Sequence, residues 1–130
     1  NNLSGKVIAI LGLSFKPETD DMREAPALDI IRGLVKNGAQ IKAYCPQRMK
    51  EAEWRLKDIE EHIKYCVNEY EAVQDTDAAV VVTEWNQFRG MNLKRVKEIM
   101  RDNYLFDLRN IYSKSSEAEN LFKYFGVGKS

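Results

Sequence analysis

Short apolar runs alternate with amphipathic segments along most of this chain. Lys6–Leu11 is typical of a strand buried on both faces, and Ala78–Val82 is the most β-prone stretch. Between them, Pro26 suits the first turn of a helix whose apolar residues recur at helical spacing until Asn37 and Gly38 end it. This alternation predicts an α/β fold, a three-layer α/β/α sandwich with a Rossmann-like, mainly parallel sheet.

The remaining periodic segments extend the pattern to about five strands, in the order 3-2-1-4-5, with helices on both faces of the sheet. Further strands are expected at Gln40–Tyr44, Ile63–Val67 and Tyr104–Phe106. Further helices are expected over Arg48–His62, after a capping box that pairs Asn68 with Glu71, and around Leu93–Met100.

The segments without periodicity are expected to be loops. Gly12–Ala25 and Thr83–Phe88 are two of these, and Ser113–Glu119, rich in Ser, Lys and Glu, predicts a mobile connection. The C-terminal tail, residues 113–130, contains a candidate for a last strand at Leu121–Val127. No composition break divides the chain, so residues 1–130 are expected to form a single domain.

Composition excludes several classes of protein. The chain has 130 residues, of which 44% are hydrophobic, and its 20 basic and 20 acidic residues cancel. We therefore expect no nucleic-acid partner, because nucleic-acid-binding domains usually carry a basic surplus. No apolar run reaches the ~20 residues that span a bilayer, and the N-terminus lacks a signal-peptide pattern. We expect a cytoplasmic domain without a membrane partner.

Cysteine and histidine are too sparse for most metal sites. Cys45 and Cys66 form no Cys-x-x-Cys pair, and His62 is the single histidine. We therefore expect no metal, a reducing compartment and a solvated role for His62.

In open α/β sheets, ligands bind outside the carboxyl ends of the strands, so the loops that follow strands are the places to search. A dinucleotide fingerprint fails there, because Ser14 and Pro17 occupy the second and third glycine positions after Gly12. The acid expected at the end of the second strand is also replaced, by Tyr44 and Cys45. The domain is not expected to bind NAD in the Rossmann manner by itself.

Cations do follow two of these strands. Lys16 and Arg23 lie after the first strand and Arg109 after the fifth, so the three could converge on a pyrophosphate. Phe15 and Trp85 lie in neighbouring loops and could cover a base or a sugar.

Structural alternatives stay open for each of these residues. Lys16 and Arg23 could neutralise the acids of Glu18–Glu24, and Arg109 could pair with Asp107. Trp85 is more typical of a core or rim residue than of a stacking platform.

Three motifs, in order, resemble one family over about Gly5 to Tyr112. Gly12–Pro26 (Gly-Leu-Ser-Phe-Lys-Pro-Glu-Thr-Asp-Asp-Met-Arg-Glu-Ala-Pro) is similar to the signature that opens the C-terminal domain of UDP-glucose 6-dehydrogenases and related nucleotide-sugar dehydrogenases. Val81–Trp85 resembles that family's Thr-Glu-Trp strand end, and Phe106–Asn110 its Phe-Asp-x-Arg-Asn segment.

The resemblance implies a UDP-sugar-binding half of an enzyme that uses NAD to oxidise the C6 hydroxyl of UDP-glucose twice, through an aldehyde held on a cysteine. By resemblance, Phe15 and Lys16 line the UDP-sugar site, Arg109 contacts the sugar end, and Arg23 reaches across to the NAD cofactor. The family's reactive cysteine, general base, NAD domain and central helix lie in segments that this chain does not include. The chain alone is therefore expected to hold no catalytic residue and to be inactive. The complete enzyme is expected to be a homodimer or larger, with the isolated domain monomeric.

Two alternatives remain. One is a related dehydrogenase that acts on a UDP-N-acetylhexosamine or on GDP-mannose. The other is a non-catalytic regulatory or interaction module of receiver-like topology, which Leu11 and Leu13 disfavour because such a module needs acids at this strand end. Cys45 also departs from the family, which usually has Asp before Pro46.

Overall fold

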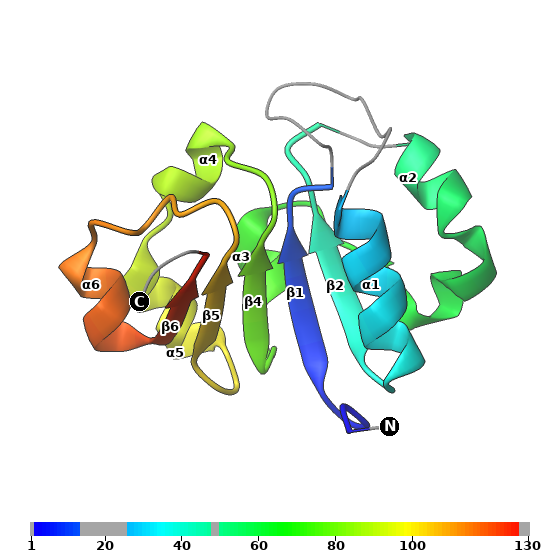
Figure 1. Ribbon diagram of the computed structural model, residues 1–130, viewed down its shortest axis with the longest axis horizontal. Helices are drawn as coiled ribbons and strands as arrows, with labels where there is room; N and C mark the ends of the chain where they lie inside the picture. The colour runs from blue at the N-terminus through cyan, green and yellow to red at the C-terminus, as the bar shows by residue number, and fades with distance from the viewer. Residues whose placement is uncertain (1, 14–25, 48–49, 128–130) are drawn as a thin grey trace.

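A six-stranded parallel sheet runs through the computed structural model, which describes residues 2–13, 26–47 and 50–127 (Figure 1). The strand order is β3-β2-β1-β4-β5-β6, and every neighbouring pair is parallel. The strands are β1 (Val7–Leu11), β2 (Gln40–Tyr44), β3 (Ile63–Tyr65), β4 (Ala78–Val81), β5 (Tyr104–Asp107) and β6 (Lys123–Gly126).

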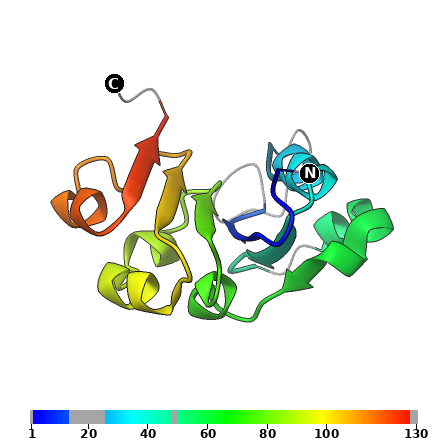
Figure 2. The ribbon, with the colours of Figure 1, turned by 90° about the horizontal axis from the view of Figure 1, so that it is seen from below.

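Helices lie on both faces of this sheet. They are α1 (Pro26–Lys36), α2 (Lys50–Arg55), the 3-10 helix η1 (Lys57–His62), α3 (Glu69–Val73), α4 (Asn86–Arg89), α5 (Leu93–Ile99) and α6 (Ser116–Leu121). Figure 2 shows α1 on one side of the sheet and α3, α5 and α6 on the other. The predicted three-layer Rossmann-like fold is confirmed, and the candidate last strand becomes β6, one strand more than the five expected.

Side chains that alternate along the strands contribute to two hydrophobic cores, one on each face of the sheet. In β1, Ile8 and Ile10 pack with Ile31 of α1, whereas Ala9 and Leu11 pack on the opposite face. Because helices cover both sides, β1 is apolar at every position, as expected for a central parallel strand.

Of the capping box predicted at the start of α3, the Asn68 cap is confirmed, whereas the Glu71 side chain reaches the amide one residue before the cap. The Asn68 side chain accepts a hydrogen bond from Glu71 N at 2.8 Å, and Glu71 Oε1 accepts one from Val67 N at 2.8 Å. The Asn68 bond satisfies one orphan amide of the helix, and the Glu71 bond holds the chain just before the cap.

The single helix expected over Arg48–His62 is wrong, since the structure divides the segment into α2 and η1. Arg32 of α1 supplies a physical reason. Its guanidinium donates to the Arg55 carbonyl at the end of α2 and to both carboxylate oxygens of Asp58 at the start of η1. The break between α2 and η1 is therefore stabilised by a residue of α1, which the local spacing of apolar residues does not reveal.

The mobile connection expected over Ser113–Glu119 is also wrong, because α6 begins at Ser116. The Ser115 hydroxyl caps it by accepting from Ala118 N at 3.1 Å, and Ala118 and Phe122 are buried. A polar composition here reflects a cap and an exposed helix face. Similarly, α4 lies partly within the Thr83–Phe88 loop that the sequence predicts.

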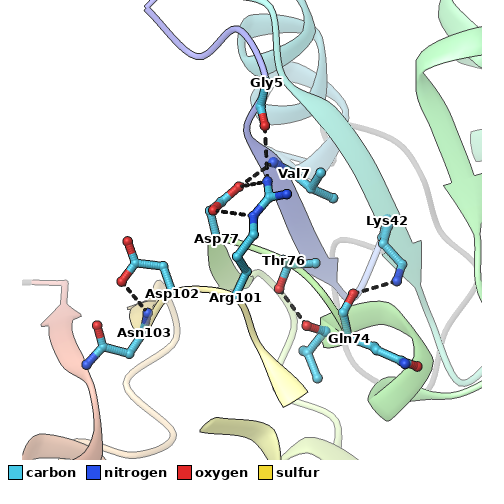
Figure 3. Close-up of polar contacts among 10 residues, drawn as sticks. Gly5, Val7, Lys42, Gln74, Thr76, Asp77, Arg101, Asp102 and Asn103 are labelled. Atoms are coloured by element: carbon cyan, nitrogen blue, oxygen red, sulfur yellow. Dashed lines mark hydrogen bonds and ion pairs between the residues drawn. The ribbon is translucent and has the colours of Figure 1, made fainter. Parts of the chain in front are cut away.

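A polar cluster ties the amino ends of β1 and β4 to the turn before β5 (Figure 3). Asp77 Oδ2 accepts from Val7 N at 2.8 Å, and Asp77 Oδ1 accepts from Arg101 Nε at 2.9 Å. Arg101 also donates to the Gly5 carbonyl at 3.0 Å. The hydrogen bond from Arg101 holds the pKa of the Asp77 carboxyl below its ordinary value.

Candidate functional site

The carboxyl ends of β1, β4 and β5 meet at one edge of the sheet. Gly12 follows β1 with φ +96°, and a Cβ added there would lie 2.6 Å from the Thr83 Cβ, beyond the end of β4. Only glycine fits both this backbone conformation and this approach. Leu108 N, just after β5, donates to the Val81 carbonyl at 3.0 Å. The loops that leave these three strands therefore start side by side.

Asp107, the last residue of β5, organises the turn that follows it. Its fully buried carboxylate accepts from Ile111 N at 3.1 Å, from Tyr112 N at 2.8 Å and from the Tyr124 hydroxyl at 2.6 Å. Burial, together with the hydrogen bond to Asp107, raises the pKa of Tyr124 above its ordinary value. A buried carboxylate that accepts three hydrogen bonds holds this turn in one conformation.

The same turn sets the backbone of Arg109. Asn110 has φ +55°, a left-handed conformation that Asn tolerates better than most residues. Its side-chain Nδ2 donates to the Val127 carbonyl at 2.8 Å. The hydrogen bonds of Asp107 and Asn110 thus fix the backbone on both sides of Arg109, while the Arg109 side chain keeps 39% of its surface exposed.

Glu84 is the partner that orients the Arg109 side chain. Arg109 Nη2 donates to Glu84 Oε1 at 2.8 Å, and Arg89 Nη2 donates to Glu84 Oε2 at 3.1 Å. The expected alternative, an ion pair between Arg109 and Asp107, is wrong because backbone amides and a tyrosine occupy that carboxylate. One carboxylate between two guanidinium groups leaves one positive charge, which suits an anionic ligand.

Trp85 is a core residue. Its side chain is 8% exposed and packs in the same cluster as Phe88. Its buried Nε1 has no hydrogen-bond partner within the described ranges. Trp85 therefore does not present a ring face for stacking on a ligand, and the alternative role as a core residue is the one observed.

Of the sequence-predicted site residues, the described part of the chain contains Arg109. Phe15, Lys16 and Arg23 lie outside the described residues. Sequence reasoning quoted Glu84 within a motif and missed its contact with Arg109. The signal available was its position two residues after the apolar run Ala78–Val82, at the carboxyl end of a buried strand.

The described residues were also searched for a metal site, an activated cysteine and a membrane-spanning helix. Across residues 2–13, 26–47 and 50–127, no three His, Cys, Asp or Glu residues are grouped so as to hold a metal ion. Both cysteines are free thiols, and burial raises the pKa of Cys66, so that thiol is not activated as a nucleophile. None of the described helices is long and apolar enough to cross a membrane.

Comparison with known sequences identifies the family. Residues 9–114 match the model of the UDP-glucose/GDP-mannose dehydrogenase family, UDP binding domain. A UDP-glucose 6-dehydrogenase of Rhizobium meliloti is 40% identical over 129 residues, which are 98% of this chain and 28% of that protein. The UDP-glucose 6-dehydrogenase TuaD of Bacillus subtilis is 38% identical over 98% of this chain and 27% of its own length. The chain thus spans about a quarter of these curated relatives, where it corresponds to the C-terminal domain.

Solved structures agree with this grouping. A UDP-glucose dehydrogenase from Pyrobaculum islandicum superposes with a TM-score of 0.79 at 25% identity, covering 99% of this chain and 27% of that one. A UDP-D-ManNAc dehydrogenase from Pyrococcus horikoshii superposes with a TM-score of 0.76 at 25% identity, covering 98% and 26%. With a parallel sheet, an arginine held at its carboxyl edge and a family model matched over residues 9–114, this chain belongs to the UDP-glucose/GDP-mannose dehydrogenase family, as its UDP-binding domain.

Proposed function

We propose that this chain is the UDP-sugar-binding part of an NAD-dependent UDP-glucose 6-dehydrogenase, with Phe15, Lys16 and Arg109 at the substrate. The observation that carries the proposal is the fixed position of Arg109 at the carboxyl edge of the sheet, 2.8 Å from Glu84. The curated relatives bear the name UDP-glucose 6-dehydrogenase, which favours this substrate over a UDP-N-acetylhexosamine or GDP-mannose.

Arg109 acts in this proposal as a charged fork. A guanidinium has five N–H donors in one plane, and the bond to Glu84 uses one of them. The others can donate to two oxygens of a diphosphate or to sugar hydroxyls, and such charge-assisted bonds contribute about 1.5–3 kcal/mol each. In this proposal Lys16 adds a second positive charge and Phe15 an apolar face, as the family resemblance implies.

NAD belongs mainly to another part of the complete protein. The described residues do not offer the Rossmann cradle, since Gly12 packs against Thr83 and β2 ends at Tyr44 followed by Cys45. NAD supplies a hydride acceptor for the oxidation of the sugar hydroxyl. Arg23 reaches toward the cofactor from this domain, and the chain alone is inactive because the reactive cysteine and the base lie elsewhere.

The rest of the assembly is part of the same proposal. Residues 1–130 form one domain, which works in the cytoplasm next to an NAD domain and a central helix in a homodimer or larger oligomer. The isolated domain is a monomer in this view.

Kinetics of the complete enzyme test this proposal against a non-catalytic module. We expect a Lys16→Ala, Arg109→Ala double variant to raise KM for UDP-glucose at least tenfold. Arg95→Ala is the matched control, because the Arg95 guanidinium packs over the Tyr70 ring rather than against Glu84 or Arg109. Unchanged kinetics in the double variant would favour a regulatory or interaction module.

A further inference from the structure

The last strand of the sheet borders the turn that carries Arg109. Figure 1 shows β6 at the sheet edge, beside β5, and the parallel register pairs Gly126 with Asp107, the residue at which β5 ends. Because the two strands of a parallel pair run in the same direction, their carboxyl ends lie at the same edge of the sheet. The carboxyl end of β6 therefore lies next to the turn over residues 107–110, although 17 residues separate Tyr124 from Asp107 along the chain.

Tyr124 of β6 holds this turn on the side that precedes Arg109. Its hydroxyl donates to Asp107 Oδ2 at 2.6 Å, and the same oxygen accepts from Tyr112 N at 2.8 Å. Burial raises the pKa of the Tyr124 hydroxyl, so the group stays protonated and remains a donor at neutral pH. Hydrogen bonds to a carboxylate are roughly twice as strong as those between neutral groups. The bond from Tyr124 therefore fixes the end of β5, two residues before Arg109.

The same strand also holds the turn on the side that follows Arg109. Asn110 Nδ2 donates to the Val127 carbonyl, directly after β6, at 2.8 Å. Gly126 leaves room for the Asn110 side chain, because a Cβ on Gly126 would lie 2.8 Å from Asn110 Oδ1 and 3.2 Å from the Tyr124 hydroxyl oxygen. The backbone on both sides of Arg109 is thus hydrogen-bonded to β6 or to the residue that follows it.

The side chain of Arg109 depends on this backbone to reach its place. Arg109 Nη2 donates to Glu84 Oε1 at 2.8 Å, from the turn after β5 to the end of β4. The planar guanidinium fork binds an anion in a defined geometry, and a misplacement of about 1 Å in a binding site can cost roughly 100-fold in rate. A strand that fixes the turn therefore affects how well Arg109 can bind a ligand.

We propose that β6 is a positioning element of the nucleotide-sugar site, and that Tyr124 is the positioning residue that holds Arg109 in place through Asp107. The inference rests on the proposed function, because it takes Arg109 as a residue that contacts the substrate. Tyr124 itself has no contact with the ligand in this proposal. Its effect is therefore expected on the affinity for the nucleotide sugar, and only in a protein that retains Arg109.

A double-mutant cycle in the complete enzyme tests this dependence. Tyr124→Phe is expected to raise KM for UDP-glucose about fivefold, with kcat and KM for NAD unchanged, because a misplaced Arg109 weakens the binding of one substrate. In the Arg109→Ala background, Tyr124→Phe is expected to change KM no further, because a residue that acts only through Arg109 has no effect without it.

Tyr104→Phe is the matched control for the loss of a tyrosine hydroxyl. Tyr104 and Lys123 are paired at the amino ends of β5 and β6, and the Tyr104 hydroxyl accepts from Lys123 Nζ at 3.4 Å. This contact lies at the other end of the two strands from the turn. Tyr104→Phe is therefore expected to leave kcat and both KM values unchanged.

Gly126→Ala gives a second variant, which keeps the Tyr124 hydroxyl. The new methyl group would displace the Asn110 side chain from its place beside Gly126, so KM for UDP-glucose is again expected to rise, and again only in a protein that retains Arg109. Gly33→Ala is the matched control, because nothing lies within 4 Å of a Cβ on Gly33.

The Arg109→Ala variant separates this inference from the proposed function. If Arg109→Ala leaves KM for UDP-glucose unchanged, the proposed function is wrong and the positioning role of Tyr124 is wrong with it. If Arg109→Ala raises KM and Tyr124→Phe does not, the proposed function stands and the positioning role is overturned. An equal rise from Tyr124→Phe with and without Arg109, or an equal rise from Tyr104→Phe, would also overturn it, because the effect would then not pass through Arg109.

Discussion

Arg109 Nη2 lies 2.8 Å from Glu84 Oε1, and this contact joins the end of β4 to the turn after β5. The second oxygen of Glu84 is 3.1 Å from Arg89 Nη2, so one carboxylate holds two guanidinium groups. Glu84 is therefore a positioning residue for Arg109 in the proposed site.

Glu84→Ala is expected to weaken UDP-glucose binding about fivefold. An exposed ion pair contributes up to about 1 kcal/mol, and its loss lets the Arg109 side chain sample other rotamers. The measurement is a titration by isothermal calorimetry, together with the heteronuclear NOE of Arg109 Nε. Glu98→Ala, an exposed change on α5, is the control. Tighter binding by Glu84→Ala would mean that the carboxylate only competes with the ligand.

Asp107→Ala is expected to lower the free energy of unfolding by roughly 3 kcal/mol. The change leaves two backbone amides and the Tyr124 hydroxyl without their buried acceptor, and each unmet donor costs about 1–3 kcal/mol. Tyr124→Phe removes a single bond and should cost about 1 kcal/mol. Urea unfolding followed by circular dichroism measures both, and equal losses would show that the amides do not depend on Asp107.

Gly12→Ala is expected to destabilise the fold by roughly 2–4 kcal/mol. The new Cβ would lie 2.6 Å from that of Thr83, and φ +96° is strained for any side chain. Gly33→Ala is the matched control, because nothing lies within 4 Å of its Cβ position on α1. Alanine there should stabilise by about 0.5–1 kcal/mol. Thermal unfolding of the two variants should move in opposite directions, and a shift in the same direction would contradict this reading of Gly12.

Asp77→Asn is expected to cost roughly 2 kcal/mol at neutral pH, because the negative charge is lost and an NH2 donor replaces one of the two oxygens that accept from Val7 N and Arg101. The Arg101 hydrogen bond lowers the pKa of Asp77 from 3.8 in the folded state. Its contribution is therefore fully present above the unfolded pKa and is lost as the pH falls through the lower folded pKa. Unfolding midpoints measured from pH 7 to pH 2 should converge for the wild type and Asp77→Asn at the acid end. A constant gap between them would contradict the assignment.

Periodicity made most of the fold predictable. The runs at Lys6–Leu11 and Ala78–Val82 indicated central parallel strands, and both are central in the sheet. The predictions failed where distant partners decide the outcome. Arg32 interrupts the helix after Arg55, and a serine cap with buried Ala118 forms α6 in a segment of polar composition.

The site was predictable in position but not in its contacts. Arg109 follows the fifth strand, as the sequence indicated, but its partner is Glu84, 25 residues away in the chain, and not the adjacent Asp107. Local charge spacing favours a near neighbour, whereas burial of the Asp107 carboxylate under backbone donors removes it from the ion pair. Such competition depends on tertiary geometry that spacing alone does not contain.

The most direct test of the central claim is an NMR titration of the isotope-labelled chain with UDP-glucose, with observation of Arg109 Nε and the amides of Gly12, Thr83 and Glu84. The proposal predicts saturable shifts at Arg109 and at the loops after β1 and β4, reduced by Arg109→Ala and unaffected by Arg95→Ala. Shifts confined to the opposite end of the sheet, around Asp77 and Arg101, would contradict a nucleotide-sugar site at Arg109.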